Sequence, residues 1–168
     1  MKKIVIINGS AGVGKDTFSS ICNDFCKTWN YSSVDKIKEI AKLCGWDGIK
    51  DEKGRIFLSE LKVATSKYND LPFKCMKEKI DEFKYSDAEL LFLHIREPEE
   101  IARAASAFNA VTLLIKSNRV KHITTNNSDA NVFNFKYDAV INNDRSIEDL
   151  KNTAKWFIER LRKMEDVM

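Results

Sequence analysis

Short runs of apolar residues recur along the chain, and between them apolar residues repeat every three to four positions. The first run reads KIVIIN and is largely β-branched, and LLFLHI farther along the chain is similarly apolar. Such runs are typical of strands that are covered on both faces of a sheet. The predicted strands are residues 3–8, 31–34, 90–95, 111–115 and 138–141.

The segments between these strands have the periodicity of amphipathic helices. The clearest stripe follows the first strand, with helical spacing at Phe18, Ile21, Cys22, Phe25, Cys26 and Trp29. Further helices are predicted over residues 35–44, over two stretches between 54 and 85, over 98–108, and from Ile147 to Leu161. No regular spacing of apolar residues is visible in residues 45–54 and 120–135, and these segments are predicted to be loops.

Strands that alternate with helices require crossover connections, which predicts a mainly parallel sheet with helices on both faces. We therefore expect an α/β fold with three layers and a five-stranded sheet. A length of 168 residues suits one compact domain, and no repeat or linker is visible, so the chain is predicted to form a single domain over 1–168.

The composition narrows the expected partners and location. The formal net charge of +3 is small and gives no reason to expect nucleic acid or a membrane surface as a partner. The apolar start of the chain is too short for a secretory signal, and no stretch approaches the ~18 apolar residues of a membrane span. The four cysteines form no C-x-x-C pair and are predicted to be small buried hydrophobes in a reducing cytoplasm.

The turn after the first strand carries the candidate chemistry. It reads GSAGVGKDT, which fits G-x-x-x-x-G-K with Asp16 in the usual Ser or Thr position. The backbone N–H groups of such a loop surround phosphates, the lysine adds a charge for the β- and γ-phosphates, and the following helix directs its positive end at them. The residues expected to bind a nucleoside triphosphate are Gly9, Ser10, Ala11, Gly12, Val13, Gly14, Lys15, Asp16 and Thr17. A glycine-rich turn that binds nothing is the alternative, but the strand and helix around the loop favour the phosphate site.

Asp16 has two possible roles. A Ser or Thr hydroxyl at this position would coordinate Mg²⁺, and a carboxylate can bind the same cation directly or through water. Asp is also favoured at the positive end of a helix without any ligand. We expect Asp16 to hold Mg²⁺, with a role confined to the helix start as the alternative.

At G-x-x-G-x-G-K-D-T the sequence resembles the phage-type deoxynucleoside monophosphate kinases, a branch of the P-loop kinases. The likeness extends to VDKIKEI with CGW, to HIREPEE and to YDAVINN, and so covers nearly the whole chain. The resemblance implies transfer of the γ-phosphoryl group of ATP, with Mg²⁺, to a small phosphorylated acceptor, with a (deoxy)nucleoside monophosphate as the expected one.

The resemblance also implies roles for particular residues. Residues 45–85 would form an acceptor-binding helical region, and residues 116–135 a lid. The expected acceptor-binding residues are Asp35, Lys36, Arg55 and Arg96. The expected catalytic residues are Lys15, Asp16, Arg96 and Arg119. An ion pair with Glu99 or Glu100 is the alternative for Arg96, and a solvated basic loop is the alternative for Arg119.

His94 departs from the family, which has Asp at this strand end. Neutral imidazole is a poor ligand for Mg²⁺. Asp16 and the triphosphate could suffice for the cation, Glu97 could replace the missing carboxylate, or phosphoryl transfer could be weak or absent. His94 could also be a hydrogen-bonded residue without a catalytic role. A nucleotide-binding protein without kinase activity is therefore the alternative function. A GTPase switch is not indicated, because the D-x-x-G and N-K-x-D motifs are missing.

Overall fold

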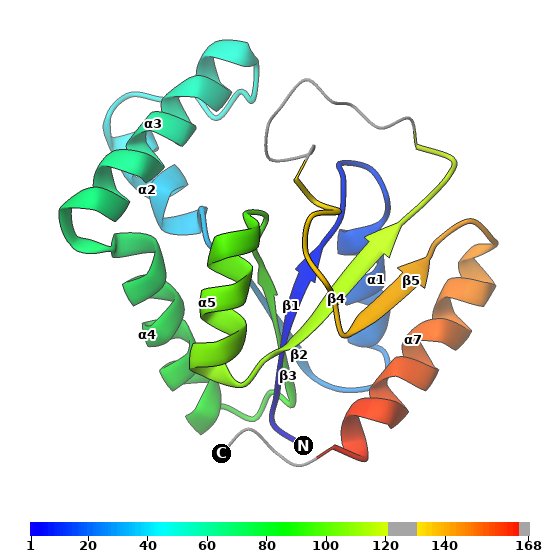
Figure 1. Ribbon diagram of the computed structural model, residues 1–168. Helices are drawn as coiled ribbons and strands as arrows, with labels where there is room; N and C mark the ends of the chain where they lie inside the picture. Colours follow the sequence, from blue (N-terminus) through cyan, green and yellow to red (C-terminus); the bar gives the residue numbers. More distant parts are fainter. Residues whose placement is uncertain (121–130, 165–168) are drawn as a thin grey trace.

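Strands alternate with helices throughout the computed structural model, which describes residues 1–120 and 131–164 (Figure 1). The elements, in chain order, are β1 (Lys3–Asn8), α1 (Lys15–Cys22), β2 (Thr28–Ser32), α2 (Asp35–Leu43), α3 (Glu52–Asn69), α4 (Leu71–Tyr85), β3 (Leu90–His94), α5 (Pro98–Phe108), β4 (Val111–Lys116), β5 (Ala139–Asn142) and α7 (Ile147–Arg162).

The five strands form one parallel sheet in the order β2-β3-β1-β4-β5. This confirms the predicted α/β fold class. The most apolar strand, β1, lies at the centre, with Ile7 paired to His94 and Asn8 paired to Leu114. Because all strands run the same way, the turns after β1, β3 and β4 meet at one edge of the sheet.

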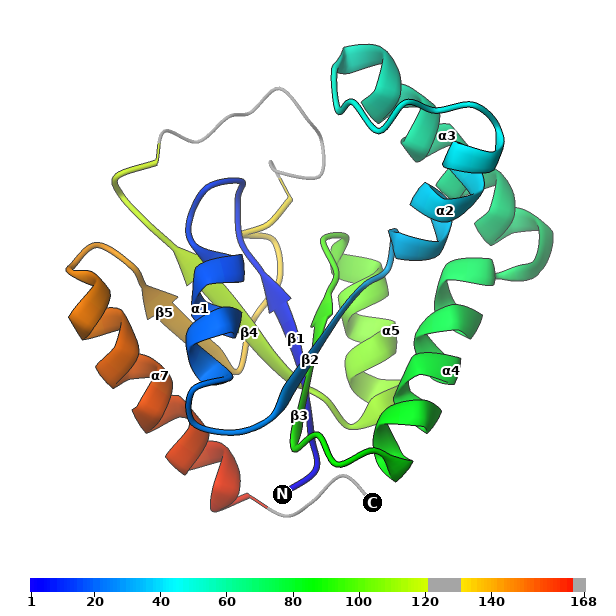
Figure 2. The ribbon, with the colours of Figure 1, turned by 180° about the vertical axis from the view of Figure 1, so that it is seen from behind.

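Helices cover both faces of the sheet. On one face, α1 and α7 pack on Val5 and Ile7 of β1 and on alternate residues of its neighbours. On the other face, α4 and α5 pack on Ile4 and Ile6. Figure 2 shows the first pair of helices in front of the sheet. The alternation of β1 between two cores explains why its sequence is apolar at every position.

The helices α2 and α3 stand beyond the carboxyl edge of the sheet, on the side of α4 (Figures 1 and 2). Only one residue of α3, Gly54, is buried, and Ile56 and Val63 are exposed. These two helices, residues 35–69, are called the arm below. No helix in the described part of the chain has both the length and the apolar character needed to cross a membrane.

Two predicted boundaries after α1 were wrong. The helix was expected to continue to Trp29, but it ends at Cys22, and β2 begins at Thr28 instead of residue 31. The Asn23 side chain explains the change, because its Oδ1 accepts hydrogen bonds from the backbone N of Thr28 at 3.0 Å and from the Thr28 hydroxyl at 3.2 Å. This contact favours a turn, and Trp29 then packs on Phe83 at the other face of the sheet, with ring centroids 6.3 Å apart.

Two further expectations need correction. The loop predicted over residues 45–54 ends earlier, because Asp51 caps α3 by accepting a hydrogen bond from the backbone N of Gly54 at 2.7 Å. Cys22 and Cys26 are buried as predicted, but Cys75 is only partly buried, and Cys44 is exposed where the chain leaves the end of α2. Of the lid predicted over residues 116–135, residues 121–130 lie outside the described residues.

Candidate functional site

The glycine loop takes the backbone shape that its sequence predicts. Gly9, Gly12 and Gly14 have φ angles of 149°, 79° and 96°, which side chains rarely allow. Two of these positions also lack room. A Cβ at Gly9 would lie 2.2 Å from the carbonyl oxygen of Ile115, and one at Gly14 would lie 2.4 Å from Nδ2 of Asn143. The loop therefore requires glycine both for its torsions and for its neighbours.

The first turn of α1 faces the loop with its backbone donors. Gly14 is the N-cap residue of α1, in the left-handed region, and no side chain caps this end. The N–H groups at a helix start attract anions, and here they are left for a ligand. This arrangement suits the phosphates of a nucleotide.

Two asparagines that sequence reasoning missed hold the loop from either side. Oδ1 of Asn8 accepts from the backbone N of Gly9 at 2.8 Å, and its Nδ2 donates to the carbonyl oxygen of Arg96 at 3.1 Å. Nδ2 of Asn143 donates to the carbonyl oxygen of Val13 at 2.9 Å. Both asparagines come directly after an apolar strand pattern, so a polar residue at a strand end was the available signal.

Lys15 lies over the loop. Its Nζ donates to the carbonyl oxygens of Gly9 at 2.6 Å and of Ser10 at 2.9 Å. The ammonium group is thereby kept next to the space that the loop surrounds. Phosphate oxygens, which carry full charge, can replace these neutral acceptors with stronger hydrogen bonds.

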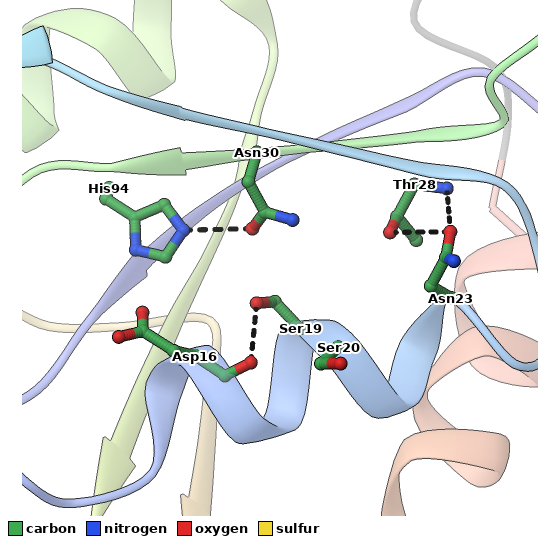
Figure 3. Close-up of a pocket in the computed structure, with 7 residues that line it drawn as sticks. All are labelled: Asp16, Ser19, Ser20, Asn23, Thr28, Asn30 and His94. Carbon is green, nitrogen blue, oxygen red and sulfur yellow. Dashed lines mark hydrogen bonds between the residues drawn. The ribbon is translucent and has the colours of Figure 1, made fainter.

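A polar cleft of about 450 Å³ lies beside the loop, between α1 and the strands β2 and β3 (Figure 3). The lining residues are Asp16, Ser19, Ser20, Asn23, Thr28, Asn30 and His94. Apart from Asp16 and His94, this lining offers only hydroxyl and amide groups. Figure 3 shows Asp16 on the helix side and His94 on the strand side of the same end of the cleft.

His94 is half-buried, and its ring is fixed by one neighbour. Nε2 lies 3.0 Å from Oδ1 of Asn30, which is an acceptor, so Nε2 carries the proton. Burial lowers the pKa of His94 below its usual value, and the Asp16 carboxylate opposes this shift. The ring is therefore neutral near pH 7, with the lone pair on Nδ1.

The predicted acceptor-binding residues of α2 point in different directions. Asp35 accepts from the backbone N of Ser32 and pairs with Lys38, both at 2.8 Å. The charges of Asp35 and Lys38 both act on the pKa of His94, in opposite directions. Lys36 instead pairs with Glu39 at 2.8 Å, and its pKa is raised by this hydrogen bond and also by Glu78 of α4. Lys38, which sequence reasoning missed, is thus the partner of Asp35, whereas Lys36 pairs with Glu39.

The three predicted arginines lie around the same edge of the sheet, on separate elements. Arg55 is exposed on the first turn of α3, where its Nε donates to the carbonyl oxygen of Lys50 at 2.9 Å. Arg96 is exposed two residues after β3. An Nη atom of Arg119 donates to the carbonyl oxygen of Asn143 at 2.7 Å, which places Arg119 beside the glycine loop.

The chemistry of the donors decides how a cation could bind here. In the described residues, no three side chains of His, Cys, Asp or Glu come together as a metal site. A cation beside Asp16 would thus need oxygen ligands from bound phosphates in addition to the protein. The Asp16 carboxylate fits Mg²⁺ in such a shared site, whereas the His94 nitrogen does not.

Comparison with known proteins finds solved structures with a similar fold. No family model and no curated protein matches the chain. Solved structures do match along nearly its whole length. Shikimate kinase from Aquifex aeolicus has a TM-score of 0.53 and 14% identity, over 95% of this chain and 98% of that one. The protein TT1252 from Thermus thermophilus has a TM-score of 0.55 and 19% identity, over 95% and 98%.

The tunicamycin resistance protein from Deinococcus radiodurans is similar to the same degree, with a TM-score of 0.55 and 12% identity over 94% of this chain and 96% of that one. At such identities the likeness establishes the fold. The chain therefore shares the α/β fold of shikimate kinase and of the two other proteins. None of the three is named as a deoxynucleoside monophosphate kinase, so that finer resemblance stays a prediction.

Proposed function

We propose that this protein is an ATP-dependent kinase of a small molecule. The observation that carries the proposal is the loop of residues 9–14, which needs its glycines and leads into an uncapped helix start with Lys15 beside it. Backbone donors, a helix start and a lysine are together the apparatus that binds the β- and γ-phosphates of a nucleoside triphosphate.

The chain's own residues would contribute position and charge. Residues 9–17 would bind the triphosphate, with Lys15 on its β- and γ-phosphates and Thr17 on its α-phosphate. Asp16 would hold a divalent cation, Mg²⁺ in the first instance, and such a cation supplies neutralisation of the phosphate charge. Arg96 and Arg119 would face the charge that develops during transfer, which is where cationic side chains accelerate this reaction most.

A (deoxy)nucleoside monophosphate is the acceptor that we propose. The resemblance to the phage-type kinases suggests it, and Lys38 and Arg96 offer cations for its phosphate at the edge of the sheet. The polar cleft favours a second candidate, an uncharged molecule rich in hydroxyl groups, because the lining beyond Asp16 and His94 is neutral. A protein that binds nucleotide without transferring phosphate is the alternative that His94 suggests.

An ADP-release assay separates these candidates. The protein is supplied with ATP and either Mg²⁺ or Mn²⁺, and tested against nucleoside monophosphates and against uncharged sugars and polyols. ADP release that depends on a monophosphate supports the first acceptor, and release that depends on a neutral alcohol supports the second. Binding of an ATP analogue by calorimetry, with no acceptor-dependent release, would leave the nucleotide-binding alternative. Absence of analogue binding would refute the kinase proposal.

A further inference from the structure

His94 presents one nitrogen to the cleft as an electron-pair donor. Its Nε2 is engaged by Oδ1 of Asn30 at 3.0 Å, so the tautomer leaves Nδ1 without a proton. Among the described residues, Asn30 is the hydrogen-bond partner of the His94 ring. Figure 3 shows Nδ1 on the side of the ring that faces Asp16.

The contact between Asn30 and His94 has the form of an outer-shell contact at a metal site. Histidines that bind metals donate their other N–H to an oxygen acceptor, which fixes both the tautomer and the direction of the ring. Asn30 comes from β2, paired in register with Phe92, and its amide oxygen provides such an acceptor.

We propose that the Asp16 carboxylate and Nδ1 of His94 together bind the cation that accompanies the nucleotide, and that this pair selects a divalent first-row transition-metal ion over Mg²⁺. The inference rests on the proposed binding of a triphosphate at residues 9–17. One oxygen and one nitrogen ligand from the protein, completed by phosphate oxygens and water, form a mixed donor set.

The preference follows from the ligands. Mg²⁺ binds oxygen and holds its water tightly, so it gains little from an imidazole. Transition-metal ions bind imidazole well, with affinities that rise from Mn²⁺ to Cu²⁺. A carboxylate in place of His94 would give Mg²⁺ two oxygen ligands and remove the preference.

The test uses Mn²⁺ as the probe ion. The affinity of the full chain for a non-hydrolysable ATP analogue is measured by calorimetry, with saturating Mg²⁺ or saturating Mn²⁺. We expect binding about tenfold tighter with Mn²⁺. The variant His94→Asp should bring the two affinities within about twofold of each other. Ser20→Ala, which changes the same cleft at an exposed residue outside the proposed ligand pair, should keep the ratio of the parent.

A spectroscopic measurement detects the nitrogen ligand directly in the parent protein. Pulsed electron paramagnetic resonance of Mn²⁺ in the complex with the analogue should show coupling to an imidazole nitrogen, and His94→Asp should lose it. Asn30→Ala, which frees the ring, should weaken Mn²⁺-dependent binding about tenfold.

The possible failures can be told apart. The cation proposal would be overturned if the analogue bound equally tightly with Mg²⁺ and with Mn²⁺, or if bound Mn²⁺ showed no coupling to nitrogen. Either result would leave the proposal of nucleotide binding in place. Absence of analogue binding by the folded parent in either ion would overturn the proposed function and this inference with it.

Discussion

The Lys15 side chain contacts the glycine loop without a ligand, and we expect it to contact the phosphates once a nucleotide binds. Its Nζ contacts two carbonyl oxygens of the loop, at 2.6 and 2.9 Å, so the charge is positioned without any phosphate present. Both partners are neutral. A triphosphate would replace them with charged acceptors, which form shorter and stronger hydrogen bonds.

Lys15→Ala should therefore weaken binding of an ATP analogue about 10- to 100-fold, the range expected for hydrogen bonds to charged groups. The midpoint of thermal unfolding should change little, because the side chain is absent from both hydrophobic clusters. Calorimetry and a thermal melt measure the two effects. Lys36→Ala is the matched control, since Lys36 pairs with Glu39, and it should bind like the parent. A folded Lys15→Ala variant with full affinity would contradict the assignment of the phosphate site.

The cysteines give a second prediction at the residue scale. Burial raises the pKa of Cys22 to about 12 and that of Cys26 to about 11, whereas Cys44 is exposed. The thiolate is the reactive form, so a thiol reagent at pH 8 should modify Cys44 first. Cys22 and Cys26 should react only after denaturation with guanidinium. Mass spectrometry of the modified peptides would show the order, and early modification of Cys22 would mean that α1 does not stay packed.

At the scale of elements, the Asn143 side chain attaches the turn after β5 to the glycine loop. Asn143 donates from Nδ2 to the carbonyl oxygen of Val13, while its own carbonyl oxygen accepts from Ser117 at 2.9 Å and from Arg119 at 2.7 Å. The asparagine thus joins three segments that lie far apart in the sequence. We expect it to position the loop for phosphates.

Asn143→Asp tests this contact with almost no change in shape. A carboxylate cannot donate to the carbonyl oxygen of Val13 and repels it instead, so the affinity for an ATP analogue should fall about tenfold, which corresponds to roughly 1.4 kcal/mol. Asn142→Asp, at the exposed last residue of β5, adds the same charge and should have little effect. Equal losses in the two variants would mean that added charge, not the lost hydrogen bond, weakens binding.

The elements also show which features could be predicted from the sequence. The first strand, the glycine loop and the start of α1 are local patterns, and all three were predicted correctly. The end of α1 was missed because the apolar spacing continues past Asn23 to Phe25 and Cys26. What stops the helix is the contact of the Asn23 side chain with Thr28, which periodicity does not register.

Contacts between distant residues could not be predicted in this way. Asn143 and Val13 are 130 positions apart, and their hydrogen bond depends on the order of β1, β4 and β5 in the sheet. Similarly, resemblance indicated Lys36 as a residue facing the acceptor, but it could not indicate that Lys36 pairs with Glu39 and Lys38 with Asp35. Such pairings depend on which side chains share a helix face, and a short motif does not specify them.

For the whole molecule, contacts with side chains of α5 help to join the arm formed by α2 and α3 to the body. Lys62 of α3 pairs with Glu100 of α5 at 2.7 Å. At the base of the arm, Arg103 of α5 pairs with Asp70 and lies 3.7 Å above the ring of Phe73. The contacts of Arg103 connect α5 with the turn between α3 and α4. The Lys62–Glu100 pair connects α5 with the middle of the arm itself. We expect the Lys62–Glu100 pair to limit how far the middle of the arm moves away from α5.

Lys62→Met should loosen the arm without unfolding the body. The Lys62 side chain is 17% exposed and that of Glu100 is 33% exposed, so the pair is partly screened and is expected to contribute up to about 1 kcal/mol. Its loss should speed hydrogen exchange of α3 amides about two- to fivefold, while the amides of β1 and β3 exchange as before, because opening of the arm is local and global unfolding is not required. Lys67→Met removes an exposed lysine from the last turn of the same helix and is the matched control.

Faster exchange throughout the sheet in Lys62→Met would show that the ion pair supports the whole fold. Unchanged exchange in α3 would show that packing of the arm on α4 is sufficient to hold the arm in place. If residues 45–85 bind the acceptor, as the resemblance to the phage-type kinases implies, Lys62→Met should also raise the KM for the acceptor more than the KM for ATP, since the ATP site at residues 9–17 lies on a separate element.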